Sequence, residues 1–555
     1  MKTDYLSIGK EALKRLRRAA ERAPEVQRKQ LEAILRRNRE TEYGVRWGFA
    51  GIHSLRAYQE RVPLSRSEDY QEYIERLIAG ERNLLTRAEP VYYAITSGSM
   101  GTPKYVPVTE EDMLSHYWDV HAAIYGMVRE YYRDTDPAEI FGKIFQVGGF
   151  VRTRLPGGQM CGVRSAAIYQ WMDLEGGFDA SDYCVPKEVL FPEEVEDLTY
   201  VKVRFALAER NITAIHSVYL HRVVAVMDYI CRNWELLLRD MERGTVDEGV
   251  PLRDCWRKKL EHWLPPDPVR AEELRRLGPD PAGLIRRIWP GMKYIVGIGG
   301  DSFPIYTQAV EHYSGGVPVH HYIYGSSESF LSVGAALGRA NAYIVIPESG
   351  FYEFLPLDRP EAARPLTMEE VRIGERYEIV LTNHSGLYRC RMRDVVKVVE
   401  FCGRAPVVCF QYRIDQVLNV ADEKLNMAQL REAFRLYRLR TGQTETGFCA
   451  QVDLAVRPGR YLIYIEGPPR PDAAAVLDTC LKEASLGYLE CRTMGDIRPV
   501  RVRFLPPGSF HRYEGRLVDR GWRLDQYKPV CVLDTPEKQQ FFAAEADRLE
   551  REDVS

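Results

Sequence analysis

The sequence contains no hydrophobic run long enough to cross a membrane, and no basic stretch followed by an apolar one comes after Met1. A membrane-spanning helix needs about 20 consecutive apolar residues, and a secretory signal needs a charged segment before an apolar one. The sequence therefore predicts a cytoplasmic protein that has no membrane partner.

Closely spaced cysteine pairs are also missing. The chain has 11 cysteines, an odd number, and none of them form a Cys-x-x-Cys arrangement. This pattern is typical of reduced thiols and argues against a disulfide framework and a zinc site. We expect Cys161, Cys390, Cys402 and Cys409 to be packing residues.

The sequence also lacks an excess of either charge. Lys and Arg total 76 against 79 Asp and Glu, which gives a net charge of -3. Such a chain has no overall field that attracts nucleic acid or an anionic membrane. We therefore expect no nucleic-acid partner, and any nucleotide that it binds should be small.

The length and composition predict more than one domain. A chain of 555 residues with 45% hydrophobic side chains is too long for one core and can fill two or more. Strand-like runs alternate with helical stretches in its middle, which favours an α/β fold. We expect a large N-terminal domain over residues 1–410, with mixed sheets and flanking helices, and a smaller α+β domain over 411–555.

Local signals predict individual elements. Leucines at helical spacing predict two amphipathic helices broken near Pro24. Capping-box spacing predicts that helices begin at Ser65 and Thr109, the first running through residue 78 and the second carrying residues 116–125. Runs rich in β-forming residues predict strands over 91–95, 294–298, 319–324, 377–381 and 394–399.

The most informative segment is a loop of hydroxyls and glycines that ends in a lysine, Thr96-Ser97-Gly98-Ser99-Met100-Gly101-Thr102-Pro103-Lys104. Gly98 and Gly101 allow the backbone to adopt positive φ and to approach an anion, so that N–H groups can converge on phosphate oxygens. The hydroxyls and Lys104 add further donors. The spacing differs from the P-loop pattern, which excludes a Walker-type site. An ordinary turn is the alternative for such a loop in isolation.

A second segment, Tyr322 to Glu328, ends a predicted strand in a Gly-Ser turn. Tyr324 could stack on an adenine ring. Glu328 could reach Mg²⁺, which prefers one or two hard oxygen ligands and keeps several waters. The alternative is an ordinary strand-turn-helix junction. The glycines of 297–302, among them Gly300, would let a flat ring lie against the backbone.

A third segment, Gly386 to Asp394, places a carboxylate at the start of a predicted strand. The two oxygens of Asp394 could accept both hydroxyls of a ribose. The alternative is a surface ion-pair network built from the three arginines of this segment.

These motifs, in this order, resemble those of the ANL adenylating enzymes, and most closely the Gretchen Hagen family of acyl acid amido synthetases, also called auxin-responsive promoter proteins. The resemblance spans nearly the whole chain. Beyond the three motifs it includes Asn38 to Gly44, Val62 to Leu64, Glu68 to Tyr70, Asn419 to Lys424 and Asp525 to Lys528.

The resemblance implies a two-step reaction that depends on ATP and Mg²⁺. A carboxylic acid attacks the α-phosphate to give an acyl-adenylate and pyrophosphate, and an amine, such as that of an amino acid, then attacks the acyl carbon. The implied nucleotide-binding residues are Ser97, Gly98, Ser99, Gly101, Gly300, Tyr324, Gly325, Ser326, Ser327, Asp394 and Arg413, with Lys104, Lys424 and Lys528 as catalytic residues and Glu328 as the metal ligand.

Two of these lysines carry a further implication. In the resembling enzymes Lys424 and Lys528 belong to the smaller domain and its hinge, which swings over the nucleotide between the half-reactions. Each would stabilise charge that gathers on the α-phosphate and on the leaving pyrophosphate. A solvated surface lysine is the alternative for either one.

The sequence departs from the family pattern at three places. Cys390 stands where a tyrosine is usual and Arg393 where a glycine is usual, which makes the backbone of the third motif less free. Asp422 replaces a glycine near the hinge, and Asp tolerates a left-handed conformation. The segment Met100 to Lys104 is closer to the general adenylating pattern, which leaves a different acceptor open.

The residues that bind the acid are the hardest to predict from the sequence. His116, Tyr117, Val120 and Tyr219 are candidate walls by position alone, and core packing is the alternative for each. Two other functions stay open, an acyl-CoA ligase with the same first half-reaction and a nucleotide-binding regulator without turnover. We expect a monomer.

Overall fold

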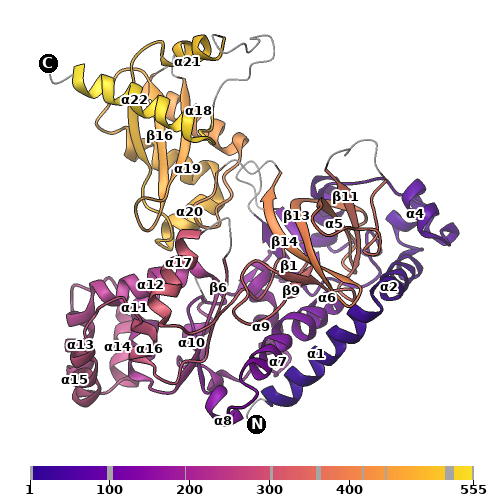
Figure 1. Cartoon of the computed structure of the whole chain (residues 1–555), viewed down its shortest axis with the longest axis horizontal. Helices are drawn as coiled ribbons and strands as arrows, with labels where there is room; N and C mark the ends of the chain where they lie inside the picture. Colours follow the sequence, from indigo (N-terminus) through magenta and orange to yellow (C-terminus); the bar gives the residue numbers. More distant parts are fainter. Residues whose placement is uncertain are drawn as a thin grey trace. The chain divides into compact units, whose positions relative to one another are not determined.

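The computed structural model of the chain describes residues 4–96, 104–193, 196–299, 304–357, 364–414, 418–443, 447–518 and 531–552 (Figure 1). The chain divides into two compact units. The first contains the described residues up to Ile414, and the second contains those from residue 418 onward. Among the described residues, no helix combines the length and the apolar character that crossing a bilayer requires.

The largest sheet of the first unit is antiparallel and has the strand order β11-β12-β13-β14-β10-β9. This confirms the strands predicted over 377–381 and 394–399. Alternate residues of its long strands, such as Val396 and Val398, fill one buried core. The strands are β9 (Ser332–Gly334), β10 (Tyr343–Val345), β11 (Phe351–Pro356), β12 (Arg376–Thr382), β13 (Cys390–Cys402) and β14 (Ala405–Arg413).

A second sheet is parallel, with the order β3-β6-β7-β8, and its strands are β3 (Lys143–Gln146), β6 (Ile212–Tyr219), β7 (Tyr294–Ile298) and β8 (Val319–His320). The strand predicted over 319–324 is too long. The chain leaves the parallel sheet after His320, and the Tyr322 carbonyl accepts instead from Gly334 N–H of β9 at 2.8 Å. Residues 321–324 therefore bridge the two sheets, and Tyr324 lies at that crossing.

Helices surround the parallel sheet and build the other large core of the first unit (Figure 1). These helices are α8 (Pro137–Ile140), α9 (Arg164–Leu174), η4 (Ala180–Asp182), α10 (Lys187–Leu190), α11 (Thr199–Ala208), α12 (Leu220–Arg232), α13 (Trp234–Arg243), α14 (Asp254–Trp263), α15 (Pro268–Leu277), α16 (Leu284–Ile288) and α17 (Pro304–Ser314).

A third, small sheet follows the order β2-β1-β5-β4, with β1 (Tyr92–Thr96), β2 (Lys104–Val108), β4 (Thr153–Arg154) and β5 (Met160–Gly162). Strands β1 and β2 pair antiparallel from Tyr92 opposite Val108 to Thr96 opposite Lys104. The predicted phosphate loop is therefore held at both ends by one hairpin.

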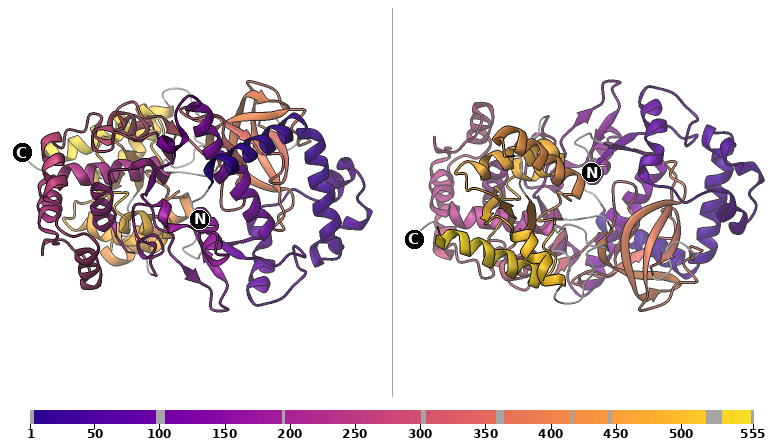
Figure 2. Two further views of the ribbon diagram at one scale, coloured as in Figure 1. Left: turned by 90° about the horizontal axis from the view of Figure 1, so that it is seen from below. Right: turned by 90° about the horizontal axis from the view of Figure 1, so that it is seen from above.

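The two predicted N-terminal helices are confirmed as α1 (Tyr5–Glu21) and α2 (Ala23–Asn38). Both views of Figure 2 show them, in indigo, beside the orange six-stranded sheet. Helix α1 packs closely on α7 (Ala122–Tyr131) because Gly9 meets Gly126, where a Cβ on Gly9 would lie 2.4 Å from the Gly126 nitrogen. The segments between α2 and β1 are α3 (Glu42–Arg46), η1 (Phe49–Gly51), α4 (Leu55–Arg61), η2 (Ser67–Tyr70) and α5 (Gln71–Ile78).

The two predicted capping boxes do not form as expected. Ser65 instead donates to the Tyr388 carbonyl at 2.8 Å, and the helical segment begins two residues later. Thr109 does precede α6 (Glu110–Ser115), but its side chain does not cap the helix. The predicted continuous helix is also interrupted, because residues His116–His121 form the π-helix η3 before α7 begins. At both capping positions the hydroxyl has a distant partner instead, Tyr388 for Ser65 and Ser385 for Thr109.

The second unit has its own core and one mixed sheet in the order β15-β16-β17. Its strands and helices are α18 (Met427–Thr441), β15 (Phe448–Asp453), β16 (Arg460–Glu466), α19 (Ala473–Ala484), α20 (Leu486–Thr493), β17 (Arg501–Leu505), α21 (Ser509–Val518) and α22 (Pro536–Glu552). This is the predicted α+β composition.

Candidate nucleotide site and acid cavity

Some of the predicted site residues lie outside the described residues. They are Ser97, Gly98, Ser99, Gly101, Gly300 and Lys528. Arg413 ends β14, where its backbone pairs with that of Asp394. The roles predicted for these residues stay predictions.

The second and third motifs meet directly. The Tyr324 hydroxyl donates to Asp394 Oδ2 at 3.0 Å, although the two residues are 70 positions apart in the sequence. Tyr324 is held by Ser332, whose hydroxyl donates to the Tyr324 carbonyl at 2.8 Å. The tyrosine ring lies 5.5 Å from the ring of Phe410. An aromatic ring and a carboxylate therefore stand together, as a site for adenine and ribose requires.

The Gly-Ser turn after Tyr324 fixes the backbone of Glu328. Ser326 N–H donates to the Ser329 carbonyl at 2.9 Å, and the Asn383 side chain donates to the Glu328 carbonyl at 2.9 Å. Within the described part of the chain, no hydrogen bond or ion pair involves the Glu328 carboxylate. A partly exposed carboxylate on a fixed backbone suits a Mg²⁺ ion that also binds phosphate oxygens.

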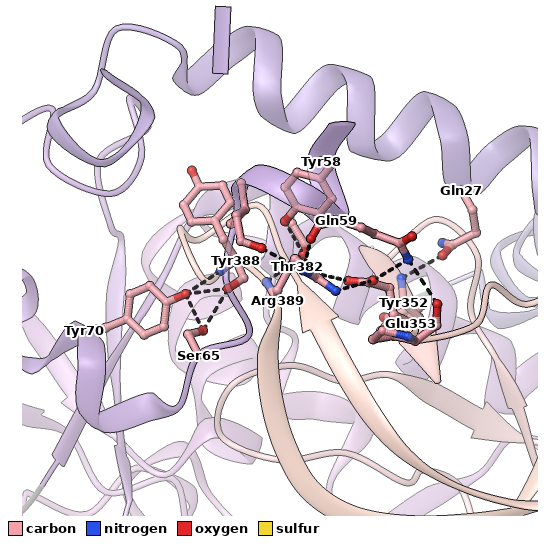
Figure 3. A network of polar contacts seen from close by, with 12 residues as sticks. Gln27, Tyr58, Gln59, Ser65, Tyr70, Tyr352, Glu353, Thr382, Tyr388 and Arg389 are labelled. Atoms are coloured by element: carbon pink, nitrogen blue, oxygen red, sulfur yellow. Dashed lines mark hydrogen bonds and ion pairs between the residues drawn. The ribbon is translucent and has the colours of Figure 1, made fainter. Parts of the chain in front are cut away.

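A buried polar network includes residues of the third motif and contacts them from several other segments (Figure 3). Arg389 makes two hydrogen bonds with the Glu353 carboxylate, at 2.9 and 3.1 Å, and both side chains are almost fully buried. The same guanidinium donates to the carbonyls of Gln59 and Val62. Because a buried guanidinium and carboxylate that satisfy each other are costly to separate, this network fixes the loop that leads to Asp394.

Arg393 adopts a left-handed backbone conformation, which a glycine adopts without strain. Its φ is +61°, in the left-handed region, and its N–H donates to the Glu378 carboxylate at 3.2 Å. The neighbouring Arg391 also binds this carboxylate, at 2.6 Å. Cys390, at the position of the usual tyrosine, is buried. Both residues, Arg393 and Cys390, belong to β13, which begins at Cys390.

Lys104 begins β2 and forms an ion pair with Glu68, with 2.5 Å between Nζ and Oε1. Both residues belong to motifs that carry the family resemblance. The lysine side chain is only 21% exposed, whereas that of Glu68 is 59% exposed. Lys104 is therefore held at the base of the phosphate loop by a carboxylate that solvent can reach.

Lys424 belongs to the second unit and lies in a turn between Leu418 and Leu425. Its φ is +46°, so this lysine adopts the left-handed conformation that we considered for Asp422. The Asp422 carboxylate instead lies 3.0 Å from Lys424 Nζ. The buried Glu423 accepts from the N–H groups of Val420 and Ala421, which fixes the turn.

The helix after the phosphate loop is tied to the third motif. Ser385, in the loop between β12 and β13, accepts from Thr109 N–H at 3.0 Å and donates to the buried Asp112 carboxylate. The ring of His116, one turn further on, lies 4.0 Å from that of Phe330, and a Cβ on Gly325 would lie 2.6 Å from the Phe330 ring. Segments next to all three motifs thus lie around one region of the first unit.

A small cavity of about 30 Å³ lies beside this region. Its walls include His116 and Val120, two of the four predicted acid-site residues. Tyr117, whose ring lies near that of His121, and Tyr219, whose ring lies near that of His221, are not among the lining residues. The lining residues are His116, Val120, His121, Ile124, Gln146, Phe150, Ser165, Tyr169, His216, Ser217, Val218, Val296 and Tyr322.

Burial keeps the cavity histidines neutral. It lowers the pKa of His121 to about 4 and that of His216 to about 3, in the latter case with help from neighbouring histidines. Burial, followed by the charge of Arg164, holds the pKa of His116 well below its usual value. These rings can therefore donate and accept hydrogen bonds without carrying charge.

Most of the cavity lining escaped sequence reasoning. Gln146, Tyr169 and His216 come from strands and a helix that no motif marks. The sequence does mark one residue next to the lining: Arg164, which precedes Ser165, is the one charged residue in the run Met160 to Met172. A buried charge in such a run is a feature that calls for a partner.

The fold and the paired motifs define an adenylating enzyme. The chain is similar to the solved GH3.15 acyl acid amido synthetase, with a TM-score of 0.62 and 25% identity over 94% of this chain and 93% of that one. It also shares its fold with a 2-hydroxyisobutyryl-CoA ligase, with a TM-score of 0.51 and 15% identity over 96% of this chain and 93% of that one.

The chain belongs to the GH3 family. The family's N-terminal domain matches residues 12–319, its central domain residues 343–413 and its C-terminal domain residues 428–537. The chain is 28% identical to the jasmonoyl-L-amino acid synthetase JAR6 of Nicotiana attenuata, over 92% of this chain and 91% of that protein. It is also 28% identical to the indole-3-acetic acid-amido synthetase GH3.8 of Oryza sativa subsp. indica, over 92% and 88%. The resemblance drawn from the motifs is confirmed.

Proposed function

We propose that the protein is an acyl acid amido synthetase that activates a small carboxylic acid with ATP and Mg²⁺ and transfers the acyl group to an amine, such as that of an amino acid. The observation that carries this proposal is the match of all three GH3 domains, together with amido synthetase relatives aligned over nine-tenths of the chain. The likeness to a CoA ligase extends to the fold alone and does not favour thioester formation.

The nucleotide would lie against the second and third motifs. In this proposal Tyr324 stacks on the adenine, Asp394 accepts the ribose hydroxyls, and Gly325, Ser326 and Ser327 border the ring. Glu328 would hold Mg²⁺, and the fit is supported by a carboxylate that has no partner among the described residues. ATP supplies the electrophilic α-phosphorus and the pyrophosphate leaving group.

The cations of the site stay predictions. Lys104, at the base of the phosphate loop, would stabilise the charge that develops as pyrophosphate leaves. Lys424 and Lys528 would act in turn as the second unit changes position between the half-reactions. We also keep a monomeric state and a cytoplasmic location as predictions.

The acid would bind in the cavity that His116 and Val120 line. This assignment is supported by its position next to Phe330, which packs on both His116 and the turn of the second motif. The named relatives act on jasmonate and indole-3-acetate, but the narrow, partly polar cavity of this chain favours a different acid.

A product analysis tests the proposed function. Purified protein is incubated with ATP, Mg²⁺, a panel of carboxylic acids and either a mixture of amino acids or CoA. Pyrophosphate release is measured, and the products are then identified by mass spectrometry. The proposal expects an N-acyl amino acid with at least one acid. A thioester with CoA and no amide, or no pyrophosphate release with any acid, would contradict it.

A further inference from the structure

Arg164 carries a buried positive charge that no carboxylate contacts. It is the first residue of α9, and only 5% of its surface is exposed. Its Nη1 donates to Met113 Sδ at 3.7 Å, and its Nε has no partner. Because a guanidinium stays protonated in proteins, burial cannot remove its charge.

The nearest carboxylate does not neutralise this charge by contact. Asp112 acts on Arg164 electrostatically, but among the described residues no carboxylate oxygen lies within 4.0 Å of an Arg164 nitrogen. Asp112 instead accepts from the Ser385 hydroxyl. A buried charge without a paired anion is unfavourable, so the protein retains Arg164 at a cost to its stability.

The charge lies next to the acid cavity. The Arg164 guanidinium is 5.1 Å from the centre of the Phe330 ring, and the same ring packs on His116. Ser165, the next residue, lines the cavity directly. Two further polar atoms there are buried without a partner, His116 Nδ1 and Gln146 Oε1. The cavity therefore offers unmatched polar atoms to whatever occupies it, and the Arg164 cation lies just behind its lining, against the Phe330 ring.

We propose that the acid site selects a short dicarboxylic acid and that Arg164 binds the carboxylate that does not react. This inference rests on the proposed function, which places the acid in this cavity. The reacting carboxylate loses its charge when it is activated, so pairing with it would leave Arg164 unpaired during the second half-reaction. A second carboxylate stays ionised throughout and pairs with the guanidinium in both steps.

The size of the cavity limits the acid. Its volume of about 30 Å³ is roughly the space that one water molecule takes in the liquid. The cavity must therefore widen to admit any acid, and a short chain that ends in a carboxylate requires less widening than a fused aromatic ring. Succinate and butanoate are suitable probes because they have four carbons each and differ by one carboxylate.

Two measurements test the proposal. Pyrophosphate release gives kcat/KM for succinate and butanoate, and thermal unfolding with and without each acid reports binding without turnover. For the natural sequence we expect a preference for succinate of about tenfold or more, since a buried charged contact discriminates strongly, and a rise in melting temperature with succinate only. Arg164→Met should abolish both effects and leave kcat/KM for butanoate within about threefold, whereas Arg164→Lys should keep part of the preference.

A matched control separates binding from packing. Arg204 is an equally buried arginine, but its guanidinium donates to Tyr200 and to the carbonyls of Asp240 and Thr245, away from the cavity. Arg204→Met should lower the melting temperature without changing the acid preference. Arg164→Met should not lower it in the absence of acid, because it removes an unpaired charge.

The outcomes also separate this inference from the proposed function. Pyrophosphate release with butanoate and not with succinate, or an unchanged acid preference in Arg164→Met, would overturn the inference and leave the amido synthetase intact. No melting shift with succinate in the natural sequence would also overturn it. A succinate-dependent shift that Arg164→Met removes, without any pyrophosphate release, would support the binding site and contradict the proposed activity.

Discussion

The hydroxyl of Tyr324 donates to the carboxylate of Asp394 across 3.0 Å, and this bond joins the second motif, which links two sheets, to the third motif in the antiparallel sheet. Tyr324 lies where the chain crosses from the parallel sheet to the antiparallel one, and Asp394 lies within β13. Because both side chains are almost fully buried, each restricts where the other can point. The geometry of the nucleotide site thus depends on how the two sheets meet.

We predict that Tyr324→Phe weakens ATP binding moderately and Asp394→Asn weakens it strongly. The phenylalanine keeps a ring for stacking but releases the carboxylate, which corresponds to about tenfold in Kd. The asparagine keeps the shape but not the two acceptors of Asp394, so we expect about a hundredfold. Titration calorimetry with ATP and Mg²⁺ measures both. Equal affinities in the two variants and the natural sequence would remove this pair from the nucleotide site.

The ion pair of Lys104 and Glu68 allows a test of whether the lysine serves chemistry or structure. If Lys104 acts on phosphate, Lys104→Ala should lower pyrophosphate release by about a hundredfold or more. The control Glu68→Gln breaks the same ion pair but keeps the lysine, and it should retain nearly full activity. An exposed pair of this kind contributes at most about 1 kcal/mol to stability, so both variants should stay folded. Equal losses of activity would assign Lys104 a structural role.

The left-handed residues of the third motif predict opposite stability changes. Arg393→Gly relieves a φ of +61° and should leave the free energy of unfolding unchanged or raise it by up to about 1 kcal/mol. Arg389 has a φ of +49°, but Arg389→Gly leaves the buried Glu353 without its partner and should cost about 3–5 kcal/mol. Chemical denaturation compares the two. A destabilised Arg393→Gly would show that this side chain matters more than its backbone strain.

The buried histidines predict that the folded protein loses stability as the pH falls. Their folded pKa values, about 4 for His121 and about 3 for His216, lie below the ordinary value of 6.5. Below pH 6.5 these histidines therefore bind protons in the unfolded chain but not in the folded chain, and the free energy of unfolding falls from there toward pH 4. Burial raises the pKa of Asp119 to about 6 and also raises that of Glu423, and both shifts work in the opposite direction. Denaturant titrations across this range should show a smaller loss for His121→Gln than for the natural sequence.

Much of the fold could be predicted because hydrophobic spacing is local. The helices α1 and α2 and the strand β7 all lie close to where the pattern placed them. The failures occurred where distant residues decide the local structure. Ser65 bonds to the carbonyl of Tyr388 instead of capping a helix, and Thr109 bonds to Ser385. A capping pattern cannot reveal partners that lie hundreds of residues away.

The candidate site shows the same division. Tyr324, Glu328 and Asp394 could be chosen from the sequence because each stands in a short motif with a chemical purpose. The cavity could not, because its walls come from β3, β6, η3 and α9, which meet only in the folded chain. Arg164 became informative once the structure showed that it is buried without an anion.

The transfer of oxygen from the acid to the nucleotide tests the central claim most directly. If a carboxylate oxygen attacks the α-phosphorus and an amine later attacks the acyl carbon, that oxygen stays on AMP. With a substrate acid labelled with heavy oxygen in its carboxylate, mass spectrometry should find one labelled oxygen in the AMP for each amide formed. Unlabelled AMP, or ADP together with labelled phosphate, would contradict activation of the acid at this site.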